Sequence, residues 1–539
     1  MQHRVFLSVS ALLLGSVGLG AGPALAAGDA EIQKLEDRLL QLENQHQSEL
    51  KALQEQIAQL KERQSETEKQ VQAQAPSATR PLLIESPTHQ FGLTSADGAY
   101  SIALIARFQL DAADYVHVAP EGGAKGAGPG GLGGPLDSGV NARRARLGVG
   151  GTLFSDWAYR LVYDFGSSAD SVTPGISGAA TSGIENAYIT YNGFYKPTNV
   201  LPVAIDVGYL DIPFTLGEAT SSNDIMFMER ASSQIIATQF GGGDFRSGLG
   251  ARTNDQRSWA GLYLTGPLSG APHNGAAEGN LSLLARASTQ ILQSDDASLH
   301  IGVNAGHLFS ARASSTTISA SSIKTTLGNQ GLALSDRPEL RVDPTVILNT
   351  GTIPTDSATI VGAETAVGLG DFFAQGEYFH YIVNQLPGGI NPGDGTANRL
   401  SPDLNFQGGY LEASYSLGGR RKYIPETGAY SGVIPDHPFS VSNGGWGALE
   451  LASRFSGITL NDKFTPGQAP HLTGGINGGD QKGYEAGLNW YPNVNLKFML
   501  DYIHTDVDKL FKPTTNGTAS TTPAGAHVNA VAARGQVAF

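Results

Sequence analysis

Hydrophobic and polar residues alternate along most of the chain after Ser101. In 298–306, for example, Leu299, Ile301 and Val303 alternate with polar or small residues. Similar runs occupy 101–112 and 496–502. A period of two predicts β-strands with one apolar face. Many of the runs reach about nine residues or more, the length that a tilted membrane-spanning strand needs. The pattern therefore predicts an all-β transmembrane barrel.

We predict sixteen antiparallel strands, an even number that leaves both chain ends in the periplasm. Tight turns such as 154–157, 369–371 and 492–494 alternate with longer loops rich in Gly, Ser and Asn, which we expect to be extracellular. Two expected periplasmic connections, 309–336 and 419–444, are long and break this rule. The predicted strand starts lie near residues 101, 142, 158, 184, 202, 257, 279, 297, 337, 358, 372, 405, 445, 481, 495 and 527.

The N-terminal part of the chain has a different pattern. Residues 1–27 combine Arg4, an apolar run and Ala24-Leu25-Ala26, which predicts a secretory signal peptide. In 28–75 the spacing of apolar residues predicts a periplasmic coiled-coil helix that pairs with its own copies. We expect 76–90 to be a linker and 91–539 to be the barrel. The coiled-coil positions are Ile32, Leu35, Leu39, Leu42, Leu50, Leu53, Ile57 and Leu60.

Composition narrows the possible functions. The 539 residues include 69 Gly and no Cys, 16% are charged, and the formal net charge is −14. The absence of Cys excludes a disulfide scaffold, a thiolate metal site and a cysteine nucleophile. The negative charge argues against a nucleic-acid partner. We expect no cofactor and no metal. The sequence contains neither G-x-S-x-G nor H-E-x-x-H, so we do not expect an enzyme.

Several segments resemble one family, the phosphate-selective porins of the O and P type. This resemblance implies a sixteen-stranded homotrimeric channel in the outer membrane of a Gram-negative bacterium, surrounded by lipid and lipopolysaccharide. It also implies diffusion of anions, above all phosphate. The final strand ends in Phe539, similar to the terminal signal that the barrel-assembly machinery recognises. The matching segments are 142–166, 227–231 (FMERA), 376–379 (GEYF), 444–462, 483–506 and 534–539 (RGQVAF).

In such a channel the chemistry is binding without reaction, and oxyanions are held best by Arg and Lys. Strand parity points Arg144 and Arg146 into the lumen. The third extracellular loop, about 211–256, follows the fifth strand; in porins this loop commonly narrows the lumen, and we expect its arginines to form the constriction. The candidate anion-binding residues are therefore Arg230, Arg246, Arg252, Arg144, Arg146, Arg160, Arg107 and Arg454, and parity also turns Arg286, Lys497 and Arg534 inward.

The lumen is also expected to be rich in acids, so three alternatives stay open. The first is a general porin, or one selective for cations or small organic solutes. The second is a structural envelope protein that tethers the membrane through its coiled coil. The third is a membrane-embedded hydrolase. The acids that parity turns inward are Asp111, Asp164, Asp206, Glu364, Glu377, Glu412, Glu450, Glu485 and Asp501.

Overall fold

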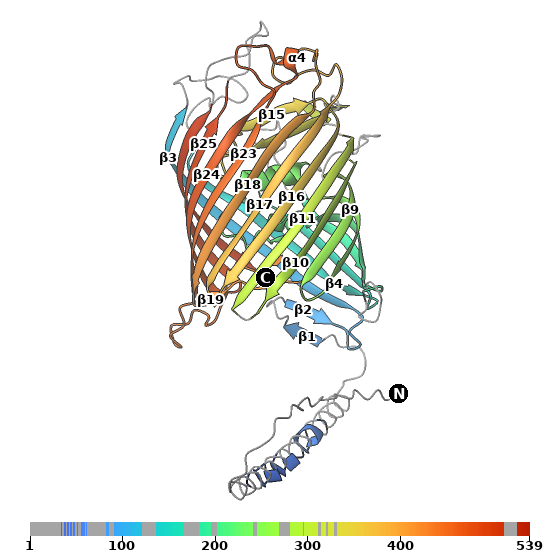
Figure 1. Cartoon of the computed structure of the whole chain (residues 1–539), viewed down its shortest axis with the longest axis vertical. Helices are drawn as coiled ribbons and strands as arrows, with labels where there is room; N and C mark the ends of the chain where they lie inside the picture. Colours follow the sequence, from blue (N-terminus) through green and yellow to red (C-terminus); the bar gives the residue numbers. More distant parts are fainter. Residues whose placement is uncertain are drawn as a thin grey trace, which may run out of the picture. The chain divides into compact units, whose positions relative to one another are not determined.

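The ring of strands closes where β26 (Ala526–Ala538) pairs antiparallel with β3 (Ser101–Pro120). Within the described residues, sixteen strands follow one another around the ring in chain order, which confirms the predicted fold class (Figure 1). The other fourteen strands are β4 (Gly139–Leu153), β5 (Trp157–Asp164), β6 (Gly183–Tyr191), β7 (Ala204–Asp211), β8 (Phe245–Asn254), β9 (Ser258–Leu268), β10 (Leu281–Gln293), β11 (Ala297–Ser310), β16 (Thr355–Leu369), β17 (Phe372–Gln385), β18 (Leu404–Leu417), β23 (Ala448–Asp462), β24 (Ile476–Asn493) and β25 (Leu496–Asp508).

The structure is a computed structural model of the chain. It describes residues 82–85, 91–120, 136–166, 183–195, 202–240, 245–268, 281–294, 296–310, 314–319, 322–327, 331–510 and 525–539, together with part of a helix within 34–61. The predicted signal peptide lies outside these residues. The described residues between Lys34 and Lys61 are helical, and the coiled coil stays a prediction. None of the helices in the described ranges is long and apolar enough to cross a bilayer.

Smaller elements accompany the ring. β1, which lies within the expected linker, pairs with β2, and β2 extends the sheet by pairing with the start of β3. The bounds of the smaller elements are β1 (Leu82–Glu85), β2 (Phe91–Thr94), α2 (Leu216–Ala219), α3 (Ser232–Gln239), β12 (Ser314–Ser319), β13 (Ser322–Leu327), β14 (Leu332–Asp336), β15 (Leu348–Ile353), β19 (Gly419–Arg420), β20 (Tyr423–Ile424), β21 (Ala429–Tyr430), β22 (Ile434–Pro435) and α4 (Pro470–Thr473).

Alternation gives each barrel strand an apolar outer face and a more polar inner face. On β23, Leu451 and Phe455 are about half exposed on the outside, whereas Arg454 is buried on the inside. On β25, Phe498 and Leu500 point outward in the same way, and Lys497 is buried. A barrel in lipid needs this arrangement, because its outer surface contacts hydrocarbon while its lumen holds water or folded loops.

Two predicted strand positions are wrong. Residues 245–254 form β8, where no start was predicted. Residues 337–341 are an irregular segment, where a start was predicted. The two errors cancel in the strand count. However, they change the side of the membrane on which the connections between these two positions lie. Because β8 is an additional crossing, the long connection that contains 309–336 lies at the extracellular end of the barrel, opposite the end of β26, rather than in the periplasm.

Both errors have a physical reason. The outer face of β8 carries one large apolar residue, Leu249, between Ser247 and Ala251, so its alternation is weak. The irregular segment contains Leu340, which is completely buried. Leu340 packs against β25 and β26 from inside the barrel, in a cluster with Ile503. Because this segment is buried inside the lumen, its apolar residues resembled those of a strand in the sequence.

Three connections fold into the barrel. We call them the third loop (212–240), the fifth loop (331–354) and the periplasmic loop (418–447). In the third loop, Ile236 and Phe240 are buried in one hydrophobic cluster with Phe379 and Tyr381 of β17. Figure 1 shows the green helical segment of this loop within the ring of strands. The lumen is therefore largely packed, and any passage must run beside these loops.

Candidate functional site

Carboxylates of the barrel wall hold the third loop by its backbone. The amides of Leu216 and Gly217 donate to Glu377 of β17 at 2.7 and 2.8 Å. The amide of Met228 donates to Asp501 of β25 at 2.8 Å. Amides at the start of a short helix carry partial positive charge, so a carboxylate is a suitable acceptor there. Glu377 and Asp501 therefore fasten the loop to the wall.

Cations of the same wall bind the loop's carbonyl groups. Arg454 donates to the carbonyl oxygen of Glu229 at 2.8 Å, and Arg534 donates to that of Met228 at 2.5 Å. Arg454 also forms an ion pair with Glu485 on the neighbouring strand. Arg454 was a candidate pore residue, and the structure does turn it inward. However, its charge is used to hold the third loop.

Arg230 and Arg246 contact the third loop in a similar way. Arg230 lies in the loop and donates to the carbonyls of Gly217 and Thr220 at 2.9 and 3.0 Å. Arg246 lies on β8, not in the loop as expected, and donates to the carbonyl of Thr238 at 2.6 Å. Both arginine side chains are at least nine-tenths buried. They are suited to fixing the loop's conformation.

The loops cover one side of the lumen. Acidic side chains that point inward from strands β16 to β25 lie beneath them, and none is more than 5% exposed. These carboxylates accept hydrogen bonds from the loops and from wall arginines, so they present little charge to water. The covered acids are Glu364, Glu377, Glu412, Glu450, Glu485 and Asp501. On the wall formed by β3 to β8 most inward side chains are buried as well, but Arg107, Arg160 and Arg252 are partly exposed.

That wall carries a group of arginines, which we call the arginine cluster: Arg107, Arg144, Arg146 and Arg160. Arg107 on β3 lies directly opposite Arg146 on β4. Arg144 is two residues along β4, and Arg160 is on β5. The cluster therefore spans three adjacent strands. All four were candidate pore residues, and the structure brings them together.

Arg146 has two acidic neighbours. Its Nε lies 2.9 Å from Asp164, and its Nη2 lies 3.1 Å from Glu185. Its guanidinium also lies over the ring of Phe245, 5.3 Å from the centroid. Arg146 is 9% exposed. Its charge is largely compensated, so it contributes mainly to the wall's structure.

Arg107 and Arg144 donate hydrogen bonds to neutral side chains. Arg107 donates to the hydroxyl groups of Ser221 and Ser222 at the tip of the third loop. Arg144 donates to the side-chain oxygen of Gln109 at 2.8 Å. Within the described ranges, Arg160 has no ion pair, and its buried Nε has no hydrogen-bond partner. Arg107 and Arg160 are both partly exposed. Arg107 and Arg160 are therefore the two cluster members that keep partial exposure.

Arg252 lies on the same side, on β8 rather than in the third loop. Its Nε is 3.0 Å from the carboxylate of Asp206, and its side chain is 26% exposed. Tyr263 also donates to Asp206, at 2.9 Å. Tyr188 of β6 lies directly opposite Arg160 on β5 and is partly exposed. The accessible wall is thus cationic with an aromatic component.

Strand parity missed one important cation, Arg143. The pairing of β3 with β4 has an irregularity here: Gln109 faces Arg144, but the next residue faces Ala142. The extra residue, Arg143, turns inward beside its neighbour and binds both oxygens of Glu229, at 2.7 and 3.0 Å. A β-bulge of this kind re-aims a side chain. The alternating pattern alone contains no signal for it.

Glu229 is the acidic centre of the third loop. It is bound by Arg143 and Arg534, and Arg341 of the fifth loop lies 3.8 Å away. Burial alone would raise the pKa of Glu229. The charges of Arg143, Arg534 and Arg144 outweigh burial and hold the pKa well below its usual range. This carboxylate stays ionised and binds the third and fifth loops to the wall.

The fifth loop also contains Arg337, which interacts electrostatically with Glu229. Burial, followed by the positive charge of Arg341, lowers the pKa of Arg337 to about 10. Its Nη1 makes a long contact of 3.5 Å with the carbonyl of Arg341. Arg341 itself forms an ion pair with Asp336. No candidate residue was predicted here, because this segment was expected to be a strand.

The periplasmic loop fills the lumen from the opposite end. Arg421 binds both oxygens of Glu450 at 2.7 and 2.9 Å and donates to the carbonyl of Asp224 in the third loop at 2.6 Å. Arg286 of β10 donates to the loop carbonyls of Thr427 and Gly428. The loops from the two ends therefore meet inside the barrel. Among the described residues, no group of His, Asp and Glu side chains is arranged to hold a metal ion.

Comparison with known proteins gives matches to porins. A family model described as phosphate-selective porin O and P matches residues 134–539. Porin O of Pseudomonas aeruginosa is 25% identical over 374 residues, which cover 68% of this chain and 77% of that relative. An uncharacterised protein of Caulobacter vibrioides is 28% identical over 173 residues, covering 32% of this chain and 29% of its own length.

Solved structures with a similar arrangement are all more distant. The outer membrane channel DcaP of Acinetobacter baumannii has a TM-score of 0.43 at 12% identity, covering 83% of this chain and 99% of its own. An anion-selective porin from Comamonas acidovorans has a TM-score of 0.43 at 10% identity, covering 82% of this chain and 100% of its own. Likenesses this loose support no argument about selectivity.

Proposed function

This chain belongs to the phosphate-selective porin O and P family and is an outer-membrane porin of a Gram-negative bacterium, and on this basis we propose that its channel conducts anions and prefers phosphate. The observation that supports the proposal is a pair of partly exposed arginines on β3 and β5, within the arginine cluster. Arg107 and Arg160 are partly exposed there. In contrast, the acids of the opposite wall lie beneath the loops.

The physical argument concerns local charge rather than net charge. An oxyanion is bound well by guanidinium groups, which donate two parallel hydrogen bonds. Arginines near low-dielectric walls attract anions more strongly than they would in bulk water. Arg107 bonds to hydroxyl groups, and Arg160 has no ion pair among the described residues, so both can bind a passing anion. Several moderate sites allow the ion to enter and to leave.

The test is conductance in planar bilayers. A salt gradient of potassium chloride should give a reversal potential of the sign expected for anions. Adding phosphate should reduce the chloride current at low concentration. A cation-selective reversal potential would overturn the anion proposal, and an anion-selective channel without a phosphate block would overturn the phosphate preference.

Two variants locate the binding site. Arg160→Gln should weaken the phosphate block by about tenfold, which corresponds to roughly 1.4 kcal/mol, and Arg107→Gln should have a similar effect. Arg257→Gln is the matched control, because Arg257 is an exposed arginine in the turn before β9. The control should leave both the block and the reversal potential unchanged.

We also propose that the chain forms a homotrimer, with the predicted coiled coil of 28–75 on the periplasmic side. Outer-membrane lipid and lipopolysaccharide are its expected surroundings. The terminal strand supports a role for Phe539 in recognition by the barrel-assembly machinery. The amide of Phe539 donates to the carbonyl of Ala106 at 3.0 Å, so this residue takes part in closing the ring. The family consists of channels, and we propose no reaction for this chain.

A further inference from the structure

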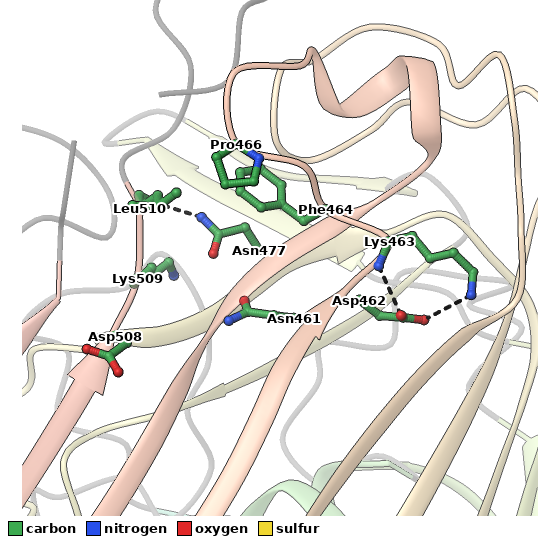
Figure 2. Close-up of a pocket in the computed structure, with 9 residues that line it drawn as sticks. All are labelled: Asn461, Asp462, Lys463, Phe464, Pro466, Asn477, Asp508, Lys509 and Leu510. Atoms are coloured by element: carbon green, nitrogen blue, oxygen red, sulfur yellow. Dashed lines mark hydrogen bonds and ion pairs between the residues drawn. The ribbon is translucent and has the colours of Figure 1, made fainter. Parts of the chain in front are cut away.

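A pocket of ≈ 440 Å³ opens at the extracellular rim, away from the third loop (Figure 2). It lies where β23 and β25 end and β24 begins. Its volume falls within the range of small-molecule sites, about 300–1,000 Å³. The function proposed above does not use this pocket.

The charged groups of the pocket neutralise one another. Two carboxylates and two ammonium groups line it. Lys463 Nζ lies 3.6 Å from Asp462. Lys509 donates to the backbone carbonyls of Ile347 and Asn349 at 3.1 and 2.8 Å. The two carboxylates and two ammonium groups balance in number, and three of the four have partners, which favours a neutral ligand over an ion.

Polar groups that point into the pocket remain available for hydrogen bonds. The side-chain oxygen of Asn461 accepts from the amide of Gly479 at 2.9 Å, which leaves its NH₂ group as a donor. The NH₂ group of Asn477 donates to the carbonyl of Leu510 at 3.0 Å, which leaves its oxygen as an acceptor. Asp508 is exposed, and within the described residues its carboxylate has no hydrogen-bond partner. The pocket thus offers one donor group and two acceptors.

One side of the pocket is apolar. Figure 2 shows the ring of Phe464 beside that of Pro466, on the side of the pocket nearest Asn477. A saccharide ring has this combination of surfaces: hydroxyl groups that both donate and accept hydrogen bonds, and faces of C–H groups that pack on an aromatic ring. An inorganic anion would use neither the apolar side nor the acceptors.

We propose that this rim pocket binds one neutral hexose unit of a saccharide. Asn461, Asn477 and Asp508 bind its hydroxyl groups, and Phe464 packs against its C–H face. The saccharide can belong to lipopolysaccharide, whose sugars surround the extracellular end of an outer-membrane protein, or it can be free in the medium. The binding is independent of conduction, because the pocket lies at the rim rather than beside the arginine cluster.

The experiment uses the full-length protein in lauryldimethylamine oxide, a detergent without a sugar headgroup. Saturation-transfer NMR is recorded with methyl glycosides of glucose, galactose and mannose, and with dephosphorylated core oligosaccharide cut from lipopolysaccharide. At least one probe should receive saturation from the protein. Signal from the core oligosaccharide alone assigns the site to lipopolysaccharide, and signal from a simple glycoside assigns it to free sugar. Both results support the proposal.

A double variant tests the location. Asn461→Ala with Phe464→Ala should reduce the transferred signal at least fivefold. The matched control is Asn443→Ala with Phe309→Ala, two exposed residues away from the pocket, which should keep the full signal. Both double variants should still conduct in bilayers, which verifies folding and keeps this test separate from that of the channel. Absence of signal from every sugar, or equal signal from both variants, would overturn the proposal.

Discussion

Arginine side chains serve two purposes in this lumen, and their partners determine which. Arg454 and Arg534 donate to backbone carbonyls of the third loop, and each is also ion-paired. Buried guanidinium groups with such partners are fixed in place and cost free energy to disturb. Arg107 and Arg160 face the accessible side of the lumen instead. Residue type alone therefore does not separate a structural arginine from a candidate pore residue, and its hydrogen-bond and ion-pair partners are needed as well.

Arg230 provides the contrasting prediction to Arg160. Because Arg230 donates to two carbonyls within the third loop, Arg230→Gln should loosen the loop rather than remove an anion site. We expect noisier single-channel current and a free energy of unfolding lower by about 1–3 kcal/mol, with the sign of the reversal potential unchanged. A reversal potential that shifts as much as in Arg160→Gln would contradict this assignment.

Glu229 should make the stability of the folded loops depend on pH. Its pKa is held well below normal in the folded protein, so its ion pairs stabilise the fold above the unfolded pKa of about 4.3 and lose this effect as pH falls. Glu229→Gln removes the carboxylate that Arg143 and Arg534 bind and should cost about 3 kcal/mol or more at pH 7. The cost should shrink at pH 3.

Thermal unfolding followed by circular dichroism in detergent measures both values. Glu426→Gln is the control, because Glu426 is exposed on the periplasmic loop and its substitution should change the Tm little at either pH. An equal loss of stability for Glu229→Gln at pH 7 and pH 3 would contradict the ion-pair explanation.

At this scale the sequence predicted part of the site. Strand parity correctly turned Arg107, Arg144 and Arg160 inward, because one face of each strand must meet lipid. It could not predict Arg143, since a single inserted residue reverses the direction of a side chain without changing the surrounding pattern. Strand parity predicts the direction of a side chain but not its hydrogen-bond or ion-pair partners. It therefore could not predict that Arg454 holds the third loop.

At the scale of elements, prediction succeeded for long apolar strands and failed for two others. The outer face of β8 has little apolar character, and the buried segment 337–341 has more than a loop normally has. The loops inside the barrel explain the second failure. They bury apolar residues such as Ile236 and Leu340 against the inner wall, where a simple barrel would have polar ones.

The periplasmic loop yields a prediction at this scale. Replacing 419–435, which contains β19 to β22, with a short Gly-Asn turn should increase single-channel conductance, because Arg421 and Tyr430 would no longer occupy the lumen. We expect roughly a doubling. The conductance of single channels in planar bilayers measures the effect.

A second deletion within the same loop is the control. Shortening 437–446 removes residues such as Val441 and Trp446, which are 88% and 79% exposed and lie outside the lumen. This variant should retain wild-type conductance. If neither deletion changes the conductance, the periplasmic loop does not restrict the passage.

For the whole molecule, the period of two together with runs of about nine residues or more predicted a closed antiparallel barrel, because half-apolar strands cross a bilayer only in a closed barrel. The pattern could not show which side of the lumen stays accessible. That depends on contacts between segments far apart in sequence, such as Met228 with Asp501 and Arg421 with Asp224. Such contacts have no periodic signature.

The N-terminal segment allows a test that separates a channel from a tether. Deleting Asp29–Gln74 removes the predicted coiled coil but none of the barrel strands. If the protein functions as a channel, conductance and the phosphate block should be unchanged within error in bilayers. Cells carrying the deletion should also show an unaltered attachment of the outer membrane to the wall. Detached membrane with normal conductance would indicate that the tether is a second function.

The placement of the covering loops has a further consequence, for hydration. In the proposed anion channel, an ion that passes Arg107 and Arg160 meets guanidinium groups on one wall, and neutral hydroxyl groups of the third loop lie beside Arg107. Such an ion sheds part of its solvent shell rather than all of it. Escape should therefore be fast, and the current should saturate only at high anion concentration.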